Sequence, residues 1–146
     1  MANTSLSDVA TKVAITAGNE TYISALGDGT AKPGDAVGLT SAGKVVQTDV
    51  GASESFVGFL VANRSDSVTI DTAIADGTPC DIVVPKSGHI YAVHIEDPAG
   101  TKYEGTPYTF SDTAGAMESA AAVIDGLATL AAQVDNEDTY GKIRWR

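Results

Sequence analysis

Short apolar runs alternate with turn sequences along most of the chain after residue 32. The turns are rich in Gly, Pro, Asp and Ser, and they stand at 32–35, 40–43, 63–67, 75–79, 85–88 and 96–100. Between them lie six runs of four to seven residues, namely AVGL, KVVQTD, FVGFLVA, VTIDTAI, CDIVV and HIYAVHI. Val, Ile and aromatic side chains favour strands, and turns about 8 to 12 residues apart are typical of sandwiches and barrels. The pattern therefore predicts an all-β fold.

An internal repeat relates the two halves of the chain. Sliding the sequence by 71 positions places Gly34 on Gly105, Val37 on Tyr108, Leu39 on Phe110, Phe56 on Leu127 and Leu60 on Ala131. Self-similarity of this kind indicates repeated structural units. We therefore expect two related β-units.

The stretch 116–134 has a helical composition but matches a strand of the first half. Its sequence AMESAAAVIDGLATLAAQV is rich in Ala, while Gly126 interrupts a helix at a cost of about 1 kcal/mol relative to Ala. The repeat matches LATLAAQV to FVGFLVAN, which predicts a strand there. At most one short helix remains, over 117–124.

Residues 2–20 are polar and weakly patterned. They contain too little apolar surface to offset an ordering cost of about 1 to 2 kcal/mol per residue. We therefore predict a flexible N-terminal arm over 1–20, followed by a single β-barrel domain over 21–146. A partner or a neighbouring subunit would order the arm through its few apolar residues and one threonine. These contact residues are Thr4, Leu6, Val9, Val13 and Ile15.

The run FVGFLVA is apolar at nearly every position, so both faces of that strand need cover. A barrel with one core covers only one face, which predicts self-association, most simply as a homotrimer.

The charge balance excludes some partners. The 146 residues include 19 acidic and 9 basic side chains, for a net charge of -10. A nucleic acid backbone or an anionic bilayer would be repelled, because the cations are scattered along the chain. The N-terminus lacks the basic start and apolar run of a signal peptide, and no run of 18 apolar residues occurs. We expect synthesis in the cytoplasm and no membrane partner.

No pattern in the sequence predicts a catalytic, metal or cofactor site. Cys80 is the only cysteine and precedes the apolar run DIVV, which predicts a buried thiol and excludes an intrachain disulfide. His89 and His94 are five residues apart, so a strand would place them on opposite faces and they could not share an ion. The Asp-Gly turns at 27–30 and 75–78 lack the residues that complete a phosphate or calcium loop. We predict that the protein is not an enzyme.

The C-terminal sequence KIRWR alternates in character. Ile143 and Trp145 share one face of a strand, and Lys142, Arg144 and Arg146 share the other. We therefore expect Trp145 in the core or at an interface.

The succession of these segments resembles the decoration, or cement, proteins that stabilise the heads of tailed double-stranded DNA viruses. The matching segments are KPGDAVGLTSAGKVVQTD at 32–49, FVGFLVA, IVVP, the second hairpin GTPYTFSDTAGAM, the loop VDNED and the closing strand GKIRWR. They cover 32–146, nearly four-fifths of the chain. The sequence departs from the pattern at Met117, where a Lys-Val-like pair is usual, and the loop VGASES at 50–55 adds nothing to the likeness.

The resemblance implies a small, β-tulip-like barrel that binds the major capsid protein on the outer capsid surface, often as a trimer. The arm residues given above would then contact the capsid or a neighbouring subunit. Two other classes stay open. A carbohydrate-binding or adhesive β-domain would need exposed aromatic side chains near a groove, and a small hydrolase would need a base and an oxyanion hole.

Overall fold

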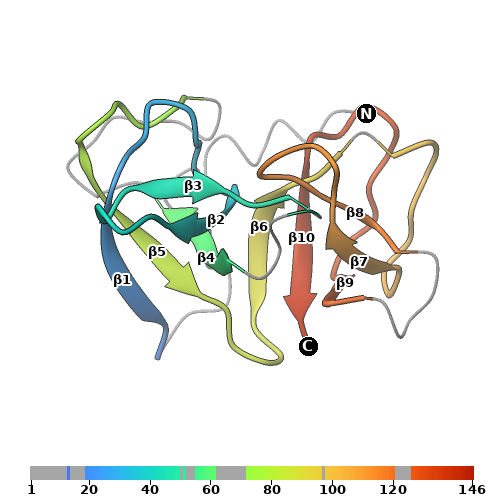
Figure 1. Ribbon diagram of the computed structural model, residues 1–146. Helices are drawn as coiled ribbons and strands as arrows, with labels where there is room; N and C mark the ends of the chain where they lie inside the picture. The colour runs from blue at the N-terminus through green and yellow to red at the C-terminus, as the bar shows by residue number, and fades with distance from the viewer. Residues whose placement is uncertain are drawn as a thin grey trace.

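The chain folds into two five-stranded antiparallel sheets that lie side by side (Figure 1). The computed structural model describes residues 13, 19–49, 51, 55–61, 72–96, 98–120 and 126–146. The first sheet contains β1 (Thr21–Leu26), β2 (Ala36–Leu39), β3 (Val45–Gln47), β4 (Phe56–Val61) and β5 (Pro79–Val84). The second contains β6 (Ile90–His94), β7 (Pro107–Phe110), β8 (Met117–Ser119), β9 (Ala128–Leu130) and β10 (Tyr140–Trp145). The predicted all-β class with two units is confirmed.

Most strands lie where the apolar runs predicted them. AVGL, KVVQTD, FVGFLVA, CDIVV and HIYAVHI form or contain β2 to β6, and the closing strand is β10. The run VTIDTAI at 68–74 falls largely outside the described residues, and the part from 72 to 74 is not a strand. Residues 117–119 form β8 and not the start of a helix, while 121–125 lie outside the described residues. β1 was not predicted.

The two sheets have the same topology. The strand order β1-β5-β4-β2-β3 of the first unit becomes β6-β10-β9-β7-β8 in the second. The repeat is therefore confirmed, with one correction. Leu60 pairs with Ile82 in the first sheet, and Leu130 pairs with Ile143 in the second. Leu60 thus corresponds to Leu130 and not to Ala131.

A one-residue bulge explains this shift. The register between β2 and β4 changes between Val37 and Gly38, so that Val37 pairs with Gly58 but Gly38 pairs with Phe56. β4 therefore carries one extra residue, Val57, in the first unit. The sequence offset that aligns the two halves therefore changes by one residue along β4.

The predicted barrel does not close. Among the described residues, the edges of each sheet meet at one isolated parallel bridge, Leu26 to Lys44 in the first unit and Ile95 to Met117 in the second. The short edge strands β3 and β8 form no ladder with β1 or β6. Each unit is a strongly curved open sheet.

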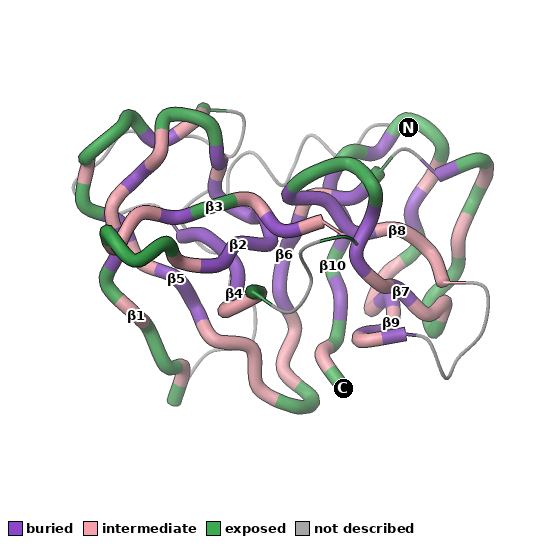
Figure 2. Tube along the Cα trace, in the orientation of Figure 1, coloured by how far each residue is buried: buried purple, intermediate pink, exposed green. Residues whose placement is uncertain are grey.

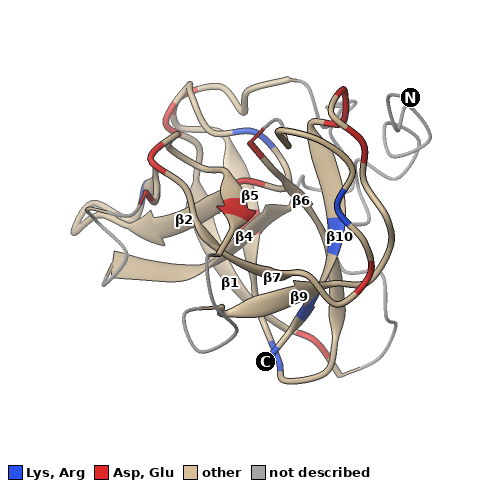
Figure 3. Cartoon of the chain, turned by 90° about the vertical axis from the view of Figure 1, so that its right-hand side faces the viewer, with Lys and Arg blue, Asp and Glu red and all other residues tan. Residues whose placement is uncertain are grey.

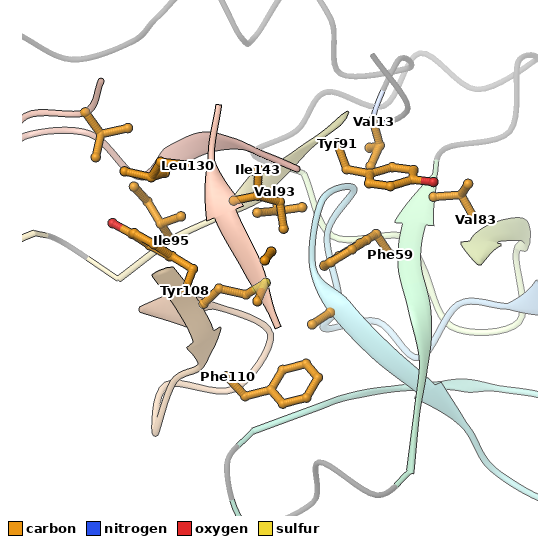
Figure 4. Packing of buried hydrophobic residues seen from close by; sticks show 14 of the residues in the cluster. Val13, Phe59, Val83, Tyr91, Val93, Ile95, Tyr108, Phe110, Leu130 and Ile143 are labelled. Carbon is orange, nitrogen blue, oxygen red and sulfur yellow. The ribbon is translucent and has the colours of Figure 1, made fainter. Parts of the chain in front are cut away.

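The principal hydrophobic core is shared by the two units (Figure 4). Phe59 and Val83 from the first sheet pack into one cluster with Tyr91, Val93 and Ile143 from the second. Figure 2 shows the buried segments where the two sheets face each other. This shared cluster holds the units together by apolar burial.

A second cluster lies within the first unit and corrects the argument for self-association. Leu60 packs there with Val37, Ile74 and Ile82, whereas its neighbour Phe59 faces the shared cluster. Successive side chains of a strand point to opposite faces, so β4 is covered on both faces within one chain. The apolar character of FVGFLVA does not require a second subunit.

Val13 is also part of the core. Its side chain is fully buried in the shared cluster, and its carbonyl oxygen accepts a hydrogen bond from the Ala92 amide at 2.7 Å. Val13 falls within the predicted arm, and its side chain is buried among residues of both units. The other predicted contact residues, Thr4, Leu6, Val9 and Ile15, lie outside the described residues.

Candidate functional site

Two largely buried carboxylate–histidine pairs lie where the first unit meets β6. β6 is an edge strand of the second sheet. The amide of Ala92 donates to the Val13 carbonyl at 2.7 Å, and the amide of His94 donates to the Gly34 carbonyl at 3.0 Å. The otherwise free edge of β6 is therefore occupied by the first unit and by Val13. We call this region the junction.

Asp35 lies at the centre of the junction, at the end of the turn KPGD. Its Oδ2 accepts hydrogen bonds from the Lys32 amide at 2.8 Å and from Gln47 Nε2 at 2.9 Å. Its Oδ1 is hydrogen-bonded to Nδ1 of His94 across the junction. The Asp35 side chain is only 5% exposed, so these bonds supply the polar contacts that a buried carboxylate requires.

A cavity of about 300 Å³ adjoins this pair. The His94 ring lies against Tyr140 with its centroid 4.5 Å away. The lining combines polar side chains from both units, namely Lys32, Asp35, Gln47, His94, Thr113 and Thr139. The hydrogen bond to Asp35 holds the His94 imidazole in one orientation. The Asp35–His94 pair therefore fixes one side of the cavity.

A second histidine–carboxylate pair lies at the start of β6. Glu20, immediately before β1, is hydrogen-bonded through Oε1 to Nδ1 of His89, and its side chain is 4% exposed. The hydroxyl of Tyr91 donates to Glu20 Oε2 at 2.8 Å and accepts from the Lys86 amide at 2.9 Å. Burial raises the pKa of Tyr91 above its ordinary range. This pair also joins the first unit to β6.

The sequence did not reveal these pairs. Each histidine lies at or beside an end of β6. Each is paired with a carboxylate 59 or 69 positions away. No local spacing signals a contact over that distance. Within the described residues, no group of three or more His, Cys, Asp or Glu side chains could hold a metal ion, and Cys80 is buried as predicted.

Two glutamates form a third polar cluster, at the seam between β6 and β8. Ser111 Oγ donates to Glu96 Oε2 at 2.5 Å, and the Glu96 amide donates to the Met117 carbonyl at 2.8 Å. The bonds from Ser111 and from Glu118 lower the pKa of Glu96, whereas the hydrogen bond to Glu96 raises the pKa of Glu118. Both glutamates line a cavity of about 190 Å³.

The C-terminal strand has the predicted two-sided character. Ile143 is fully buried, and Trp145 stacks on Phe56 with ring centroids 5.5 Å apart. Lys142 and Arg144 are exposed on the other face of β10. Figure 3 shows the acidic residues dispersed over several parts of the chain. Trp145 is thus confirmed as a core-packing residue.

Comparisons with known proteins add no assignment. No protein-family model and no curated protein matches the sequence. The described segments include no helix with the length and apolar character needed to span a membrane.

Proposed function

We propose that the protein is a non-catalytic structural component of a virus particle. In this proposal it binds the major capsid protein on the outer surface of an icosahedral capsid of a tailed double-stranded DNA virus and stabilises the shell. It would be made in the host cytoplasm and act as a homotrimer without nucleic acid or membrane partners.

The observation that carries the proposal is the repeated unit itself. The succession of hairpins that resembles decoration proteins recurs as two sheets of identical strand order. The described histidines are both paired with carboxylates that join these units, so these polar groups act in holding the fold. A compact acidic clamp present in many copies needs only modest affinity at each contact, because avidity multiplies the effect.

Co-sedimentation with shells tests the proposal. Undecorated shells of a candidate virus would be mixed with increasing amounts of the full chain and then pelleted. The expected result is saturable co-pelleting that protects the shells against heat. No saturable binding to the shells of any candidate would contradict the proposal.

The competing classes are separated by two further assays. An adhesive or carbohydrate-binding domain would bind defined glycans on an array. A hydrolase would turn over generic ester or glycoside substrates, and a His94→Ala variant would lose that activity. We expect neither signal.

A further inference from the structure

The cavity of about 300 Å³ at the junction has no part in the proposed function. Its walls come from the turn 32–35 and β3 of the first unit and from the end of β6, the loop 113–116 and the start of β10 of the second. The Ala36 amide donates to the Gly115 carbonyl at 2.9 Å, and the Gly115 amide donates to the Thr48 carbonyl at 2.9 Å. The loop 113–116 is therefore fixed to the first unit, and the cavity is formed before a ligand arrives.

Asp35 is the only carboxylate among the residues that line the cavity, and both of its oxygens are already bonded. Oδ1 is bonded to His94, and Oδ2 accepts from the Lys32 amide and from Gln47. Because the side chain is only 5% exposed, Asp35 presents little surface to the cavity. A ligand would instead meet the two basic residues beside it, Lys32 and His94.

Lys32 brings a positive charge to the cavity. Its backbone amide is bonded to Asp35. Among the described residues, no carboxylate lies within ion-pair distance of its ammonium group. The ammonium group can therefore bind an anion without first losing another partner, and the attraction is stronger where protein walls exclude water.

His94 adds a hydrogen-bond donor when its ring is protonated. Nδ1 is bonded to Asp35, and within the described part of the chain Nε2 has no hydrogen-bond partner. In the protonated ring Nε2 carries a hydrogen and donates, whereas in a neutral ring protonated at Nδ1 it can only accept. The Asp35 carboxylate offsets the positive charge of the protonated ring.

Other lining residues are apolar or carry a hydroxyl group. Ile95, Ala116 and Tyr140 are buried and give the cavity an apolar wall, while Thr113 and Thr139 contribute hydroxyl groups. Because Lys32 and His94 are both bonded to Asp35, the two basic residues lie on the same side of the cavity. This arrangement suits a small ligand with an anionic group at one end and an apolar chain.

We propose that the cavity binds a small organic acid, with its carboxylate between Lys32 and His94 and its apolar chain on Ile95, Ala116 and Tyr140. A carboxylate has two acceptor oxygens, one for the Lys32 ammonium group and one for Nε2–H of His94. A volume of about 300 Å³ is at the lower end for small-molecule cavities, so the acid has few atoms. This goes beyond the proposed function, because binding of the acid requires no shell and its failure would leave shell binding unaffected.

The two histidines of the chain allow a direct test by nuclear magnetic resonance. Both are bonded to a carboxylate through Nδ1, but His94 lines the cavity and His89 does not. Pentanoate would be titrated into the full chain at about pH 6, where histidine side chains can be protonated, while the ring signals of both histidines are followed. We expect saturable shifts of the His94 signals and unchanged His89 signals. Pentanamide has the same shape without the charge and should cause no saturable shift.

Substitution of Lys32 tests the charge that holds the acid. Lys32→Gln removes the ammonium group, and we expect calorimetry to show at least about tenfold weaker binding of pentanoate. The matched control is Lys86→Gln, which removes the same charge in the turn before β6, at the opposite end of that strand from His94. This control should bind pentanoate as the unmodified chain does, and circular dichroism confirms that each variant is folded.

The pH dependence of binding tests the part played by His94. Titratable residues that line the cavity, or that adjoin a lining residue in the sequence, are Lys32, Asp35, His94, Glu96, Asp112, Asp138 and Tyr140. Histidine is the side chain whose charge ordinarily changes between about pH 5 and pH 8. The affinity for pentanoate should therefore fall at least about threefold between about pH 6 and pH 8. His94→Gln can still donate to Asp35 and should remove this dependence.

Any of four results would overturn the proposal. Pentanamide that binds as tightly as pentanoate would show that the charge is not recognised. Unchanged binding by Lys32→Gln, or the absence of saturable shifts at the His94 ring, would show that the acid does not bind in this cavity. An affinity of the unmodified chain that is independent of pH would exclude donation by His94. Tighter binding of an acetylated and amidated glutamate than of pentanoate would show that the carboxylate belongs to a protein partner and not to a free acid.

Discussion

Asp35 and His94, 59 residues apart in the sequence, meet across the junction of the two units and are hydrogen-bonded to each other. The pair is nearly buried, with side chains 5% and 13% exposed. Because the Asp35 carboxylate also accepts bonds from Lys32 and Gln47, it links the turn of the first unit, β3 and β6. The orientation of the two units therefore depends on this carboxylate.

Asp35→Ala should destabilise the protein by about 3 kcal/mol, because removing one partner of a buried pair leaves the other uncompensated. Denaturant unfolding measures this. The matched control is Lys44→Ala, which breaks the exposed Lys44–Asp76 pair, whose Nζ and Oδ1 are 2.7 Å apart, and should cost less than about 1 kcal/mol. Equal effects of the two substitutions would show that the Asp35–His94 pair does not hold the units.

Val13→Ala should destabilise the chain by about 2 kcal/mol, because it removes two methyl groups from the shared core. Val46→Ala, at an exposed position of the same residue type, should change the stability by less than about 0.5 kcal/mol. Thermal unfolding of both variants makes the comparison. Removal of residues 2–18 should lower the melting temperature for the same reason, because it removes Val13 from the core.

The opposite pKa shifts of Glu96 and Glu118 should make stability depend on pH. The raised pKa of Glu118 contributes stability that is complete below the ordinary glutamate pKa and is lost as the pH rises through the raised value. The lowered pKa of Glu96 contributes stability that is complete above the ordinary pKa and is lost as the pH falls through the lowered value.

Glu118→Gln separates these contributions. A glutamine keeps the hydrogen-bond donor at every pH, so the variant should lose less stability than the unmodified chain as the pH rises through the raised pKa of Glu118. Melting temperatures measured across that range test this. Parallel curves for the two proteins would show that the Glu118 carboxyl group does not contribute to the pH dependence of stability.

Much of the fold could be predicted from the sequence because alternation and turn residues act locally. The runs AVGL and CDIVV became strands where they were expected. β1 was missed because its sequence TYISAL follows a polar segment and half of its residues are exposed, so the apolar pattern is weak. The repeat matched the correct strands, but it aligned Leu60 with Ala131 and not with Leu130. The bulge in β4 causes this one-residue error, and a bulge cannot be recognised from composition.

The polar sites were harder to predict. Asp35 and Glu20 are single carboxylates in ordinary turn and boundary sequences, and their pairing with histidines arises only when the two units pack. The burial of Val13 could not be predicted for a related reason. The segment has little apolar surface of its own, but the core of both units covers this side chain.

Cryo-electron microscopy of undecorated shells mixed with the full chain tests the central claim most directly. The account predicts regular density on the outer shell surface that saturates with added protein and into which the two-unit fold can be placed. Bare outer surfaces on the shells of every candidate virus, imaged with the protein in excess, would contradict it.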